Sequence, residues 1–121
     1  MTNKRIFAIF GAVALAVVGA LPVMAAAPDT LTVEALVADQ VCLNGDTVQV
    51  TLTATVDSTS EAGSRWDFTN DGRFDTRLST NHTVVTTYGD ELNITARVRV
   101  RNREGSRASD TVSFQTLRCT N

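Results

Sequence analysis

Residues 64–76 read SRWDFTNDGRFDT, and this stretch decides the fold class. Trp66 and Phe68 are two positions apart, so in a strand they share one face. Residues 70–72 are asparagine, aspartate and glycine, the types that tolerate the positive φ of a tight hairpin turn. Phe74 then resumes the apolar face. The stretch therefore predicts a strand, a tight turn and a second strand, with Trp66 in the core.

The rest of the chain repeats this strand-and-turn pattern. Residues 47–56 alternate strictly, with valine, leucine and alanine on one face and mainly threonine on the other. Such alternation is typical of a strand with one face on a core and the other in water. Further strands are expected over residues 31–34, 82–88, 92–100 and 107–117, with a turn at 44–46 and a bulge or sheet switch at 36–37. No helical period follows residue 25, so the pattern predicts a β-sandwich.

Residues 1–25 predict a signal peptide of bacterial type. Lys4 and Arg5 precede the uncharged apolar run at residues 6–20. That run is short for a membrane span, which needs roughly 20 apolar residues, and this favours cleavage over an uncleaved membrane anchor. The candidate cleavage positions follow Ala25, Ala26 and Ala27.

The predicted mature chain is one small domain with a mildly acidic balance. Residues 26–30 form a short linker, and residues 31–119 form the sandwich. Without Lys4 and Arg5, 9 of the 11 basic residues remain against 13 acidic ones, a net charge of −4. This balance argues against nucleic acid or an anionic membrane as the main partner. We expect a secreted, extracellular or periplasmic protein with no membrane span after cleavage.

The two cysteines of the chain are Cys42 and Cys119. An even cysteine count in an exported chain predicts a disulfide between them, and the alternative is a pair of free thiols. Metal binding by this pair is disfavoured, because no further soft ligand lies nearby in the sequence.

Three segments resemble the PKD (polycystic kidney disease) domain family. They are residues 47–56, Arg65-Trp66-Asp67-Phe68 with Asp71-Gly72, and residues 86–98. The resemblance covers roughly residues 30–117. It implies an immunoglobulin-like β-sandwich of about seven antiparallel strands, found in extracellular proteins. Three features depart from the family. The turn after Phe68 is one residue longer, residues 76–85 make a longer connection, and the cysteine pair is not a general family feature.

Four oxygen-bearing side chains lie close together in the central stretch. They are Asp67, Asn70, Asp71 and Asp75. Calcium takes six to eight oxygen ligands, and some members of the PKD family bind calcium, so this set is a candidate calcium site. The EF-hand spacing fails, because Thr69 and Leu78 stand at ligand positions. The alternative is that Asp67 and Asp71 bond the turn backbone while Asp75 is solvated.

Four arginines alternate along the chain. They are Arg97, Arg99, Arg101 and Arg103, and in a strand they project from one face. Such a stripe is a candidate binding face for acidic polysaccharide or for the carboxylates of a partner protein. The alternative is a solvated outer face paired with acidic or threonine side chains.

These patterns predict a non-enzymatic module of the cell surface that binds a protein or a polysaccharide. His82 is the single histidine, and no nucleophile and orienting acid are set around it by a recognised motif. We therefore expect no catalytic residues and, apart from the candidate calcium site, no cofactor. The alternative is a small structural or assembly subunit of an envelope complex that pairs an edge strand with its partner. The oligomeric state stays open.

Overall fold

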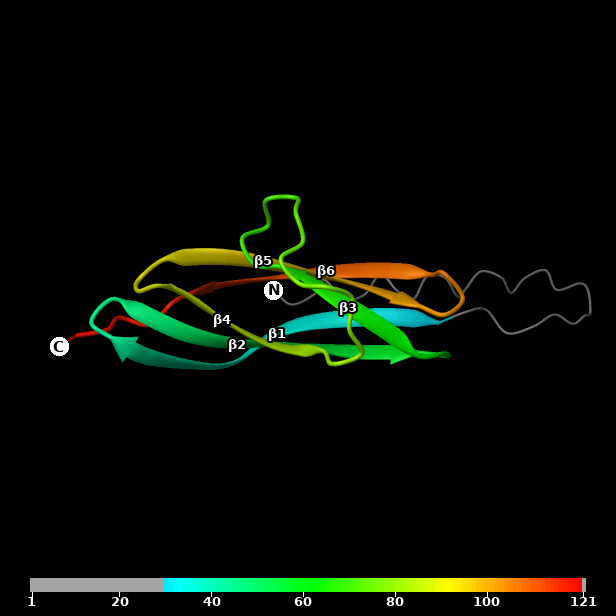
Figure 1. The fold of residues 1–121 in the computed structure, drawn as a ribbon, viewed down its shortest axis with the longest axis horizontal. Coiled ribbons are helices and arrows are strands. Elements are labelled where there is room, and N and C mark those ends of the chain that lie inside the picture. The colour runs from blue at the N-terminus through cyan, green and yellow to red at the C-terminus, as the bar shows by residue number, and fades with distance from the viewer. Residues whose placement is uncertain (1–29, 121) are drawn as a thin grey trace, which may run out of the picture.

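The computed structural model describes residues 30–120, which form two three-stranded antiparallel sheets packed face to face (Figure 1). One sheet has the order β1-β2-β4, with β1 (Leu31–Asn44), β2 (Thr47–Ser58) and β4 (Thr83–Gly89). The other has the order β3-β5-β6, with β3 (Ala62–Asp67), β5 (Asn93–Asn102) and β6 (Arg107–Gln115). The all-β prediction is confirmed, with six strands in the described range rather than about seven. The predicted signal peptide lies outside the described residues, as does the linker up to residue 29.

The first two strands form a long hairpin around the predicted turn at residues 44–46. Asn44 Oδ1 accepts a hydrogen bond from the backbone N–H of Asp46 at 3.3 Å, a contact that favours asparagine in turns. The strand register shifts between Val37 and Asp39, next to the irregularity expected from the sequence. A bulge is what the structure shows there, because β1 stays paired with β2 on both sides of it.

The core lies between the two sheets and is built by the alternating strands. Its fully buried apolar residues are Val48, Val50 and Leu52 of β2, Trp66 of β3, and Ala96, Val98 and Val100 of β5. Trp66 pairs in register with Val98 of β5, so the largest fully buried side chain of the core stands beside the central strand of its sheet. The prediction that Trp66 is a core residue is therefore confirmed.

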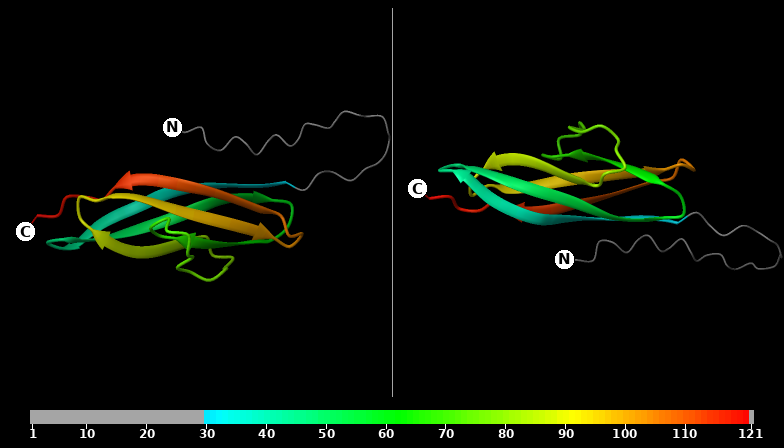
Figure 2. Two further views of the ribbon diagram at one scale, coloured as in Figure 1. Left: turned by 90° about the horizontal axis from the view of Figure 1, so that it is seen from above. Right: turned by 60° about the horizontal axis from the view of Figure 1, so that its bottom comes forward.

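The predicted hairpin after Trp66 does not form, and residues 68–82 instead make a loop that projects from the sandwich (Figure 2). Asn70 and Gly72 adopt φ values of 57° and 94°, as their residue types suggested. The turn they make leads the chain away from the direction of a returning strand. The expectation that Phe74 resumes the core face is wrong, because Phe74 lies against arginines on the outer side of the sheet.

The same loop then covers the outer edge of β3. Ser64 and Ser79 exchange backbone hydrogen bonds of 2.8 and 2.9 Å, and the N–H of Asp75 donates to the carbonyl of Trp66 at 2.7 Å. These bonds satisfy backbone groups that an uncovered edge strand leaves open.

The opposite side of the sandwich, where β1 and β6 lie side by side, is closed by polar side chains. Asp110 Oδ2 accepts a hydrogen bond from the N–H of Ala35 at 2.8 Å. Further along, Gln40 donates to the carbonyl of Gln115 and accepts from the N–H of Leu117. Side chains rather than a backbone ladder therefore join the two sheets along these edges.

The predicted disulfide is present and joins Cys42 near the end of β1 to Cys119, after β6. The two Cα atoms are 5.7 Å apart, within the usual range for a disulfide. The bond ties the segment after β6 to the first strand.

None of residues 30–120 belongs to a helix long and apolar enough to cross a membrane.

Candidate functional site

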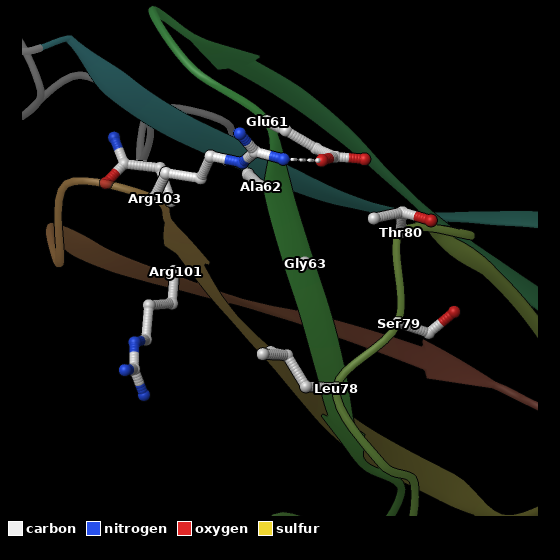
Figure 3. A pocket seen from close by; sticks show the side chains of 9 residues that line it. Glu61, Ala62, Gly63, Leu78, Ser79, Thr80, Arg101 and Arg103 are labelled. Carbon is white, nitrogen blue, oxygen red and sulfur yellow. Dashed lines mark hydrogen bonds and ion pairs between the residues drawn. The ribbon is translucent and has the colours of Figure 1, made fainter.

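Three of the predicted arginines project from the outer face of β5. Arg97, Arg99 and Arg101 alternate along this strand with core residues of the same segment. The fourth, Arg103, follows the end of the strand, and its guanidinium forms an ion pair with Glu61 at 3.1 Å (Figure 3). The structure therefore separates Arg103, which has an acidic partner, from the three arginines of the strand.

The neighbouring strands add two arginines to the same face. Arg65 of β3 stands opposite Arg99 of β5, and Arg107 of β6 stands opposite Arg101. Residues directly opposite one another in an antiparallel pair share one face of the sheet. We call this set the arginine face: Arg65, Arg97, Arg99, Arg101 and Arg107.

Phe74 lies over the arginine face and contacts three of its guanidinium groups. The guanidinium carbons of Arg65, Arg97 and Arg99 are 5.0, 5.3 and 4.8 Å from the centre of the Phe74 ring. A cation this close to an aromatic face is attracted by the ring quadrupole. The loop at residues 68–82 thereby contributes an apolar surface that holds the guanidinium groups close together.

The arginine face carries positive charge without acidic partners. Within residues 30–120, the five arginines form no ion pair, and every basic residue of this range is arginine. Burial lowers the pKa of Arg99, and so does the positive charge of Arg107, Arg65, Arg97 and Arg101. Like charges held together in this way favour the binding of an anion, which relieves their repulsion.

Beside the arginine face lies a shallow groove with a volume of about 350 Å³ (Figure 3). Its walls include Gly63 of β3, Leu78 and Ser79 of the loop, and Arg101 of the arginine face. A Cβ atom at Gly63 would come within 2.8 Å of Leu78 Cγ, so glycine is needed for Leu78 to lie against the strand. The groove therefore offers an apolar side chain next to an arginine that has no acidic partner in the described range.

Asp67 is the buried acid of the central stretch, with 1% of its surface exposed. Its two carboxylate oxygens accept hydrogen bonds from the N–H groups of Asp71 at 3.1 Å and Gly72 at 2.8 Å. Burial opposes ionisation of this carboxyl, but the hydrogen bonds from Gly72 and Asp71 outweigh it and lower its pKa. Asp67 therefore closes the turn that ends β3.

Two more of the candidate calcium ligands, Asp71 and Asp75, accept backbone hydrogen bonds in and around the same turn. Asp71 Oδ1 accepts the N–H of Arg73 at 2.9 Å, and Asp75 Oδ2 accepts the N–H of Phe68 at 2.8 Å. Among residues 30–120, no three acidic, histidine or cysteine side chains are placed to hold a metal ion together. This donor set does not match the six to eight oxygens that calcium takes.

His82 pairs with a serine of β3. Its Nδ1 lies 2.9 Å from the Oγ of Ser64, which is 2% exposed, and burial lowers the pKa of His82. Asp75, the acid near His82 in the sequence, bonds the backbone of Phe68 instead. The contact between Ser64 and His82 anchors the residue before β4 to β3.

The sequence identified the β5 arginines but missed three members of the site. Arg65 precedes the core residue Trp66, so its outward direction was available from strand alternation. Arg107 follows Arg101 across a predicted turn, and strand pairing places the two opposite each other. Phe74 gave no such signal, because its position depends on the path of the loop.

No protein-family model, curated protein or solved structure matches this chain.

Proposed function

We propose that this protein is a non-enzymatic binding module of the cell surface or envelope, with a PKD-type immunoglobulin-like sandwich as its scaffold. The arginine face binds acidic groups of a partner. The observation that carries the proposal is the cluster of five arginines, three of which contact Phe74 and none of which has an acidic partner within residues 30–120. A rigid sheet that presents such a cluster is a scaffold for recognition rather than for bond cleavage.

The chemistry of arginine supports an anionic partner with planar or multiply oxygenated groups. A guanidinium presents a fixed fork of donors that matches carboxylate and phosphate oxygens, whereas lysine offers a point charge. Successive arginines on β5 are spaced by about 7 Å, the two-residue repeat of a strand. A regular row of this kind suits a polymer with repeated acidic groups, and an acidic polysaccharide is the partner we favour over an acidic protein segment.

The location outside the cytoplasm is part of the proposal. The disulfide between Cys42 and Cys119 supports it, because such bonds persist in oxidising compartments. The predicted signal peptide at residues 1–25 points the same way, although it lies outside the described residues.

Affinity electrophoresis tests the proposal. The full chain, exported to the periplasm of an expression host, is run through gels containing polygalacturonate or neutral dextran. We expect retardation by polygalacturonate alone, and weaker retardation as salt is added, because salt screens surface charge.

The decisive variant is Arg99→Glu, with Arg118→Glu as the matched control. Both replacements change the charge equally, but Arg118 pairs with Glu91 and lies outside the arginine face. We expect Arg99→Glu to weaken binding by roughly tenfold or more, equivalent to about 1.4 kcal/mol, and Arg118→Glu to bind like the wild type. Equal effects of the two changes would show that net charge, not the arginine face, controls binding.

A further inference from the structure

The outer edge of β4 is open in the described part of the chain. The N–H of Ala54 donates to the carbonyl of His82 at 3.0 Å, just before β4 begins. In an antiparallel ladder the residues bonded to the neighbouring strand alternate. Thr83, Val85 and Thr87 therefore point their backbone N–H and C=O groups away from β2.

Few of these outward groups have a partner. The N–H of Thr83 donates to its neighbour Asn81 at 3.1 Å, a local contact. Within residues 30–120, the outward N–H and C=O groups of Val85 and Thr87 have no hydrogen-bond partner. Strand β4 therefore presents a short row of unused donors and acceptors.

Each of the other sheet edges makes contacts within the domain. The loop bonds to the edge of β3 at Ser64, and the edges of β1 and β6 are joined by the contacts of Asp110 and Gln40. Exposed edge strands usually carry charges, prolines or bulges that prevent pairing with another chain. Thr83–Gly89 contains no charged residue and no proline, and its register with β2 is continuous. The edge therefore has the composition of a pairing surface.

We infer that β4 pairs with β4 of a second copy of this chain, antiparallel and across a two-fold axis at Val85. An identical strand is complementary to itself in this arrangement, because the two Val85 residues exchange both backbone hydrogen bonds. Val85 is 55% exposed on the outer face, so its side chain packs against its equivalent. The register pairs Thr83 with Thr87 and places Asp90 opposite Thr80, so no two acids oppose each other.

The pairing joins the two β1-β2-β4 sheets into one continuous six-stranded sheet. The arginine face belongs to the other sheet, β3-β5-β6, and stays open in both copies. The dimer thereby presents two arginine faces on one particle. The inference does not depend on what the arginine face binds.

The mass of the exported full chain in solution tests this inference. Light scattering coupled to size-exclusion chromatography is run from micromolar to millimolar protein. We expect a dimer for the wild type and a monomer for Val85→Pro, since proline removes an N–H that points away from β2 and leaves the ladder intact. Val85→Lys, which brings two like charges together at the axis, must also be monomeric. The Val85→Lys variant keeps the test valid if the proline variant does not fold.

A cysteine at the axis gives an independent readout. Residues of a hydrogen-bonded antiparallel pair have Cα atoms about 5.5 Å apart, within reach of a disulfide. Val85→Cys should form a covalent dimer under mild oxidation, and Leu36→Cys, which is also partly exposed but on β1, should not. A wild type that is monomeric at every concentration overturns the inference, as does a dimer that persists in both Val85→Pro and Val85→Lys.

Discussion

Asp67 shows how one side chain can set the path of a whole loop. It stands at the end of β3 and holds the N–H groups of Asp71 and Gly72 with its two oxygens. The turn that results leads the chain outward, which allows Phe74 to reach the arginines. A residue that looked like a metal ligand in the sequence therefore acts as a backbone acceptor.

Replacing Asp67 with asparagine should destabilise the domain by about 2 kcal/mol. The amide is uncharged and keeps one acceptor oxygen, so one of the two N–H groups loses its acceptor and the other a charged partner. Urea denaturation measures the change, with Asp71→Asn as the control. Asp71 is exposed and bonds a single N–H, that of Arg73, so its replacement should cost less than about 1 kcal/mol. Equal stabilities of wild type and Asp67→Asn would contradict this role.

The same carboxylate predicts part of the acid sensitivity. The pKa of Asp67 in the fold is lower than its usual value of 3.8, so its ionised form stabilises the native state above that pH. This stabilisation is lost as the pH falls from 3.8 through the lower folded pKa. The wild type should therefore lose stability over that interval, and Asp67→Asn should lose less, as followed by thermal unfolding at several pH values.

At the scale of elements, the strands were predictable and the loop was not. The alternation over residues 47–56 predicted β2, because a strand with one buried face imposes a period of two. Residues 68–82 carry the same residue types as a hairpin turn, but their path is decided by hydrogen bonds between residues far apart in sequence, such as Ser64 with Ser79. A local sequence pattern does not reveal such long-range contacts. The expectation of a seventh strand came from the family resemblance and was made without knowledge of these contacts.

The attachment of the loop to β3 can be tested at Gly63. Alanine at this position brings its Cβ within 2.8 Å of Leu78 Cγ, and displacing that side chain should cost about 1 kcal/mol of folding stability. Leu78→Ala in the same background removes the clash, so the double variant should recover most of that loss. Urea denaturation of the wild type, Gly63→Ala, Leu78→Ala and the double variant gives the coupling energy between the two positions. Additive effects would mean that the loop does not lie against β3 at this point.

At the scale of the whole molecule, the disulfide constrains nearly the full length of the domain. Cys42 and Cys119 are 77 positions apart. In the chain-entropy model, closing such a loop raises the free energy of the unfolded chain by about 4 kcal/mol. The double replacement Cys42→Ser and Cys119→Ser should lower stability by about that amount in urea denaturation. Reduction of the wild type should reproduce the loss, and an unchanged midpoint in both cases would contradict it.

The arginine face is itself a property of the whole molecule, which explains why only part of it could be predicted from the sequence. Alternation along β5 was enough to find Arg97, Arg99 and Arg101. Joining Arg65 and Arg107 to them requires the order and register of three strands, and adding Phe74 requires the path of a loop. Two-residue periodicity carries no information on either.

The most direct test of the binding face is an NMR titration that follows the arginine side chains. The exported protein is labelled with ¹⁵N and titrated with galacturonate oligomers while the Nε–H resonances and the backbone amides are recorded. We predict that the largest shifts fall on Arg65, Arg97, Arg99, Arg101 and Arg107 and on the amides around Phe74, with Arg118 unaffected. Shifts confined to the β1-β2-β4 sheet, or shifts shared equally with Arg118, would contradict the proposal that the arginine face is the binding site.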